Sequence, residues 1–174
     1  MPSHRSDVGP KRARSSSRVL ATCEHPDGAA RLRALRRQAH QFLRALALSH
    51  VELSLVLTTD ARIRQVNRHW RHKDRATDVL SFPAGNMPQI PGRRRALGDV
   101  VISLDTAHRR AREDGRPLGA ELARYLAHGI LHLLGHDHHE RAQAAKMARA
   151  ELRLLGALGM VAAALPEGRA GRRR

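Results

Sequence analysis

Histidines gather in one short segment of this chain at a spacing that strongly restricts its local structure. His128 and His132 lie four residues apart in an apolar stretch, 118–134, whose pattern predicts a helix. On a helix that spacing places both imidazoles on one face, a single turn apart. Gly135 favours the left-handed conformation that ends a helix, and the resulting turn lets His138 reach the same point. The segment therefore predicts three nitrogen ligands for one divalent cation with an open fourth position, as in a catalytic zinc site.

Two neighbouring side chains, His136 and Asp137, are not expected to bind the ion directly. A lone histidine on an apolar helix face usually serves packing, whereas three at this spacing around a glycine favour a metal. His136 is expected to orient a ligand or to touch substrate rather than to coordinate the ion. Asp137 has two open interpretations, since it either holds an imidazole by its second ring nitrogen or caps the next helix. Imidazoles also bind nickel, cobalt and copper, so the ligand set alone does not choose the metal.

The residue after the first histidine argues against one class of enzyme. Zinc peptidases with this spacing carry a glutamate there as the general base, and this chain carries Gly129. A metal site can still act on a phosphodiester, because the ion itself activates water. The ligand pattern therefore fits phosphate chemistry better than peptide chemistry.

The charge balance points to the same kind of substrate. The 174 residues contain 32 Lys and Arg against 16 Asp and Glu, a formal net charge of +16. More than half of this excess lies in the predicted single domain, 18–165, between a disordered basic arm, 1–17, and a basic tail, 166–174. Such a body attracts polyanions, nucleic acid first and anionic membrane second. Aromatic residues make up only 2%, which excludes RNA binding by several stacked aromatic platforms.

Cysteine usage and hydropathy predict a cytoplasmic location. Cys23 is the single cysteine, so an internal disulfide and a thiolate metal cluster are excluded. The first residues contain no apolar stretch typical of a signal peptide. The longest uncharged run, 154–165, is too short to span a bilayer, so no membrane association is expected.

Hydrophobic periodicity predicts an α+β fold, a small mixed β-sheet of about four strands packed with about five helices. Asp60 and Asp105 are expected to cap the second and third helices, and residues 83–97 form a long loop. The expected strands are 18–24, 50–58, 79–82 and 98–104, and the expected helices are 28–47, 60–70, 105–114, 118–134 and 139–155.

The histidine segment 128–138, HGILHLLGHDH, resembles the signature of the YbeY-type bacterial endoribonucleases, the rRNA maturation factors. Its one departure is His136, where that family usually has tyrosine. Two further blocks agree and follow in family order. They are residues 67–83, with Asn67, Trp70, Arg71, Lys73, Asp74 and TDVLSFP, and residues 97–103, LGDVVIS.

This resemblance implies a zincin-like metalloprotein fold with one zinc ion held by His128, His132 and His138. It also implies cleavage of single-stranded RNA, maturation of the 3′ end of the small-subunit rRNA, and ribosome quality control. The expected partners are single-stranded RNA or rRNA and the small ribosomal subunit with its assembly factors. The family's functionally important arginine corresponds to Arg71.

The expected function is therefore a metal-dependent endoribonuclease in which Arg71 and His128 are catalytic. Arg71 opens a polar loop, where a guanidinium can clamp a phosphate in a bidentate way. The proton acceptor stays open between a metal-held hydroxide, an unligated histidine and the RNA 2′-hydroxyl. Residues 93–95, three arginines, either hold backbone phosphates or are solvated. The alternatives are a non-catalytic, metal-stabilised ribosome-assembly factor and, less favoured, a metallopeptidase.

Overall fold

The computed structural model describes residues 17–85, 88, 90–137 and 140–160. Within these ranges it has four strands and five helices, which confirms the predicted α+β class. The predicted arm and tail, and His138, lie outside the described residues, apart from the last residue of the arm. The strands are β1 (Arg18–Cys23), β2 (Val51–Thr58), β3 (Val79–Pro83) and β4 (Arg95–Ser103); the helices are α1 (Ala29–Ala45), α2 (Asp60–Arg71), α3 (Leu104–Glu113), α4 (Leu118–Leu133) and α5 (Arg141–Ala157).

The four strands form one mixed sheet in the order β1-β2-β4-β3. β1 and β4 both run parallel to β2, and β3 pairs with β4 in the antiparallel direction. β2 lies inside the sheet, and its Leu53, Leu55 and Leu57 are fully buried, as the alternating pattern of that strand predicts. β3 is an edge strand with β4 as its one neighbour in the sheet.

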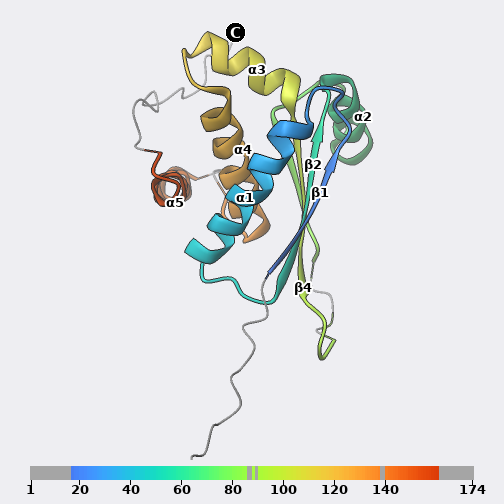
Figure 1. Ribbon diagram of the computed structural model, residues 1–174. Coiled ribbons are helices and arrows are strands. Elements are labelled where there is room, and N and C mark those ends of the chain that lie inside the picture. The colour runs from blue at the N-terminus through green and yellow to red at the C-terminus, as the bar shows by residue number, and fades with distance from the viewer. Residues whose placement is uncertain (1–16, 86–87, 89, 138–139, 161–174) are drawn as a thin grey trace, which may run out of the picture.

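Helices cover both faces of this sheet to different extents (Figure 1). The main core joins one face to α1, α3, α4 and α5, and α4 is its most buried helix. A smaller cluster beneath α2 contains Ile63, Leu80 and Val101, so α2 covers the other face beside β3. The edge strand β3 therefore lies between α2 and α4. The C-terminal end of α2 can approach the C-terminal end of α4 across this strand.

Two expected helix caps are wrong. The cap of α2 is Thr59, whose Oγ1 accepts a hydrogen bond from the Arg62 amide at 3.2 Å. The cap of α3 is Ser103, whose Oγ accepts from the Thr106 amide at 3.1 Å. Each aspartate lies inside the helix that follows its hydroxyl residue. Asp60 instead accepts hydrogen bonds from the hydroxyls of Ser103 and Thr106, at 2.5 and 2.6 Å.

The expected long loop is shorter than the sequence indicates, because β4 begins at Arg95 and not at Gly98. Arg95 pairs with Val51 at the start of β2, so ladder pairing outweighs the three consecutive arginines there. In the described part of the chain, none of the helices has the length and apolar content that a membrane span requires.

Candidate functional site

Helix α4 brings the two predicted histidine ligands together. The Nε2 atoms of His128 and His132 lie 3.0 Å apart, and their ring centroids are separated by 4.5 Å. Two imidazoles bound to one tetrahedral zinc, at Zn–N distances of about 2.0–2.1 Å, have nitrogens about 3.3 Å apart. The pair therefore already has nearly the separation that a shared cation requires, which fits the predicted metal.

Glu151, on α5, orients the first of these rings. Its Oε1 lies 2.6 Å from His128 Nδ1, and its side chain is largely buried. A carboxylate on Nδ1 favours the tautomer that carries its proton there, which leaves Nε2 with a lone pair for a metal. Sequence reasoning missed this residue and considered Asp137 for the role. The predicted helix 139–155 offered two carboxylates, Glu140 and Glu151, and helix periodicity did not show that Glu151 would face His128.

The turn after α4 is as predicted. Gly135 has φ +82°, in the left-handed region, and its amide donates to the His132 carbonyl at 3.0 Å. The His136 amide donates to the Leu131 carbonyl, also at 3.0 Å, so the chain closes tightly over the helix end. Asp137 is not the cap of α5, because that position is held by Glu140.

The third predicted ligand, His138, lies outside the described residues. Among the residues that are described, no cluster of three histidine, cysteine or carboxylate side chains is arranged to hold a metal ion. His128 and His132 therefore supply the part of the predicted ligand set that the structure brings together, and His138 as the third ligand stays a prediction.

A cleft of about 580 Å³ joins this histidine pair to Arg71. Arg71 is the last residue of α2, and its Nη2 donates to the carbonyl of Ser81, on β3, at 3.2 Å. The cleft thus lies over the edge strand, between the ends of α2 and α4. It is lined by Arg71, Lys73, Thr77, Asp78, Val79, Ser81, His128, His132, Gly135, His136 and Asp137. Arg71 and His128 therefore line the same cleft although they are 57 positions apart in the sequence.

Gly129 has a packing role that the sequence did not reveal. A Cβ at this position would lie 2.7 Å from Cγ1 of Val100 and 3.1 Å from Oγ of Ser81. Helix α4 therefore approaches β3 and β4 so closely that the position has no room for a side chain. The glutamate of a zinc peptidase does not fit here.

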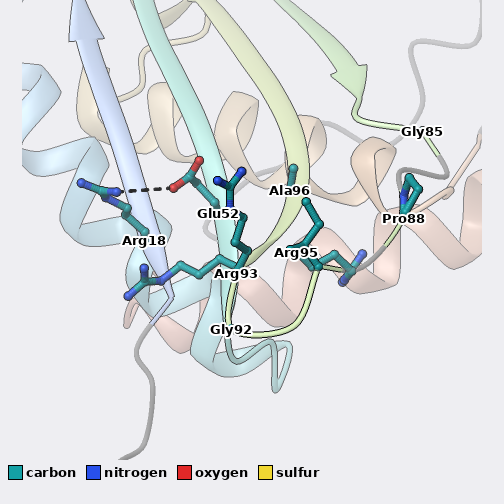
Figure 2. Close-up of a pocket in the computed structure, with 10 residues that line it drawn as sticks. Arg18, Glu52, Gly85, Pro88, Gly92, Arg93, Arg95 and Ala96 are labelled. Carbon is teal, nitrogen blue, oxygen red and sulfur yellow. Dashed lines mark ion pairs between the residues drawn. The ribbon is translucent and has the colours of Figure 1, made fainter.

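The three consecutive arginines lie elsewhere. Arg93, Arg94 and Arg95 line a separate hollow of about 620 Å³ at the hairpin end of the sheet, where Arg18 also pairs with Glu52 at 3.8 Å (Figure 2). Val100, on β4, lies against Gly129, which follows His128 in the sequence. Arg95 lies five residues before Val100 on the same strand, a separation of about 17 Å. These arginines do not line the cleft that contains the histidine pair.

The fold has a counterpart among solved structures. The solution structure of TM1509 from Thermotoga maritima superposes with a TM-score of 0.54 and 23% sequence identity, covering 87% of this chain and 99% of that one. That likeness supports the fold described above and carries no statement about activity.

Sequence comparison gives a more specific result. The family model described as endoribonuclease YbeY matches residues 23–159, which include the histidine segment, Arg71 and Glu151. The protein named endoribonuclease YbeY from Anaeromyxobacter dehalogenans is 61% identical over 87% of this chain and 77% of its own length. Its namesake from Anaeromyxobacter sp. strain Fw109-5 is 55% identical over 86% of this chain and 77% of its own length. The matched motifs and the cleft that they build lead to one conclusion, that this chain belongs to the endoribonuclease YbeY family.

Proposed function

We propose that this protein is a metal-dependent endoribonuclease that cuts single-stranded RNA during rRNA processing. The observation that carries the proposal is the convergence of His128 Nε2 and His132 Nε2, 3.0 Å apart, in the same cleft as Arg71. The family's name supplies the reaction class, and this cleft supplies groups suited to it.

His128, His132 and His138 would hold the metal, and we propose zinc, which catalytic sites with three imidazoles and an open position are known to bind. When bound, it supplies a Lewis acid that activates water and polarises a phosphate oxygen. Glu151 holds the His128 ring in place through Nδ1, so His128 serves as a preoriented ligand.

Arg71 is suited to bind the scissile phosphate. Its guanidinium is anchored by one hydrogen bond to the Ser81 carbonyl, and the residue remains exposed at the cleft. The remaining N–H groups of a guanidinium can donate two parallel hydrogen bonds to phosphate oxygens. A fixed positive charge at that place stabilises the charge that develops on those oxygens during cleavage.

A peptidase is disfavoured by the packing at Gly129, because the general base of that class has no space there. A non-catalytic, metal-stabilised assembly factor is the remaining alternative. Burial of the histidine pair away from a cleft would have favoured that alternative. The pair instead lines an accessible space together with Arg71.

The setting of the reaction is also part of the proposal. The basic balance of the chain suits rRNA, and we propose the small ribosomal subunit and its assembly factors as partners. Cys23, the one cysteine, is a free thiol, which is consistent with the reducing cytoplasm.

The test is cleavage of a single-stranded RNA by the zinc-loaded chain and three variants. His132→Ala and Arg71→Ala should each lower the rate by about 100-fold or more, since the first removes a ligand of the metal and the second removes the positive charge at the scissile phosphate. Arg110→Ala is the matched control, because Arg110 lies in an exposed ion pair with Glu113 on α3 and outside the cleft.

Elemental analysis of the purified proteins accompanies that comparison. Wild type should carry about one zinc per chain, and His132→Ala should carry less. Equal cleavage by wild type and both cleft variants, all folded, would show that the nuclease is a contaminant and would support the assembly-factor alternative.

A further inference from the structure

Trp70 is a large apolar side chain that is exposed to solvent beside the cleft. It is 66% exposed, more than any other large hydrophobic residue in the described ranges. It is also the single tryptophan of the chain. An indole packed into the core would stabilise the fold considerably. Trp70 contributes little of this stabilisation, because its side chain on α2 is exposed to solvent.

The exposed ring is held in a defined position. Its centroid lies 4.9 Å from that of His69 in an edge-to-face arrangement, and 6.1 Å from that of Phe82, on β3, at a tilt of 58°. These two rings support the indole without burying it. A ring fixed in this way loses little conformational entropy when a flat ligand stacks on it.

The ring is linked to the cleft through strand β3. Arg71 Nη2 bonds to the carbonyl of Ser81, and the neighbouring Trp70 packs beside the next residue of the strand, Phe82. Ser81 lines the cleft that contains the histidine pair. A nucleotide chain whose phosphate meets Arg71 and then leaves the cleft over β3 therefore passes the indole.

Charge around the ring favours a polyanion over an apolar partner. Trp70 lines a hollow of about 410 Å³ together with Arg62 and Arg68, and both arginines are exposed. Guanidinium groups beside an accessible aromatic ring form the combination that binds single-stranded nucleic acid, by contacts to phosphates and by stacking of bases.

We propose that Trp70 is a stacking platform for an unpaired base of the RNA whose neighbouring phosphate is bound at Arg71. The inference rests on the proposed function and adds to it a reason for single-strand preference. A base paired within a helix is already stacked on both sides, so only an unpaired base can rest on the indole.

The intrinsic fluorescence of the chain provides the test, because its tryptophan signal comes from Trp70 alone. The probe is a single-stranded oligouridine carrying 2′-O-methyl groups, which block attack by the 2′-hydroxyl, and gel electrophoresis after the titration checks that the oligomer is intact. Stacking predicts a saturable loss of fluorescence on binding. An abasic oligomer with the same backbone should bind through its phosphates without that loss.

Variants extend the test to affinity. Trp70→Ala should weaken binding of the oligouridine by about 5- to 150-fold, the range that one base–aromatic stack provides, and Trp70→Phe should retain most of the affinity. Leu152→Ala is the matched control, because Leu152 is an exposed apolar residue on α5 that does not line the cleft. Melting curves of each variant exclude loss of folding.

Each outcome decides the proposal. Equal quenching by the abasic oligomer, or unchanged RNA affinity in Trp70→Ala, would overturn it and would leave Trp70 as a surface for a protein partner. The result is separable from the proposed function. If the protein quenches on binding RNA but does not cut it, the stacking role of Trp70 is supported and the proposed nuclease function fails. If the protein cuts RNA without quenching, the nuclease function is supported and the stacking role fails.

Discussion

Glu151 and His128 form a contact on which the geometry of the histidine pair depends. Removing the carboxylate by Glu151→Ala leaves the ring free to rotate and lowers the basicity of Nε2, so zinc affinity should fall by about 10- to 100-fold. Competition against a colorimetric chelator measures this directly. Glu113→Ala, which removes an exposed carboxylate on α3, should bind zinc as wild type does. Equal affinities in both variants would contradict the orienting role.

Glu121 is a second residue whose ionisation should be visible in a measurement. It is fully buried on α4, and Arg124 Nη2 donates to its Oε1 at 2.5 Å. Burial alone would raise the pKa of this carboxyl, but the hydrogen bond and charge of Arg124, with Arg116 nearby, outweigh it, and the pKa is lowered. The carboxylate therefore stabilises the fold above the unfolded pKa of about 4.3, and this stability is lost as pH falls through the lower, folded pKa.

The lowered pKa of Glu121 gives a specific expectation for the variant Glu121→Gln. At neutral pH the variant should lose about 3 kcal/mol of unfolding free energy, because it leaves the half-buried guanidinium groups of Arg116 and Arg124 without their countercharge. The deficit should shrink as the pH falls from the unfolded pKa of about 4.3 toward the lower pKa of the folded state, at which wild type loses the same charge. Urea unfolding across pH measures it, and Glu113→Gln, at an exposed ion pair, is the control. A deficit that does not change with pH would argue for a packing effect.

Single residues also show where prediction from the sequence worked. His128, His132 and the bend at Gly135 are set by local spacing, since helix periodicity and a left-handed glycine act over a few positions. Glu151 was missed because its contact with His128 spans 23 positions and depends on how α5 packs on α4. Local patterns carry no information about such packing.

At the scale of elements, the approach of α4 to the sheet is the tightest constraint on the cleft. Gly129→Ala should lower the free energy of unfolding by about 1–3 kcal/mol, because the added methyl meets Val100 and Ser81. Gly119→Ala is the matched control on the same helix. Nothing lies within 4 Å of its added Cβ, so helix propensity should leave stability unchanged or raise it by up to about 1 kcal/mol. Thermal unfolding of the two variants checks the contrast, and equal midpoints would refute it.

The elements themselves were largely predictable, and their ends less so. Each strand and helix seen in the described ranges was expected from hydrophobic periodicity, a signal spread over many residues. The caps of α2 and α3 were each misplaced, since Thr59–Asp60 and Ser103–Asp105 offer competing cap residues within two positions. The side chain that caps a helix is the one whose oxygen can accept a hydrogen bond from an amide of the first turn. That choice depends on the backbone angles at the helix start, which the residue types alone do not determine.

At the scale of the whole molecule, the excess of positive charge governs encounter with RNA. Affinity for single-stranded RNA should fall steeply as salt rises, by about 0.7 in log–log slope for each phosphate neutralised. Arg71→Ala should reduce that slope by about 0.7, whereas Arg110→Ala should leave it unchanged, because Arg110 already pairs with Glu113. Binding titrations at several salt concentrations test both statements. A flat dependence in wild type would count against phosphate recognition.

The edge position of β3 has a consequence for how this protein loses activity on heating. One wall of the cleft is a five-residue strand with a single neighbour, while the histidine helix belongs to the main core. Edge strands open at a smaller cost in free energy than interior ones. Fraying of β3 from β4 would separate Arg71 and Ser81 from the histidines while β1, β2 and the core helices stay folded, so inactivation should precede melting.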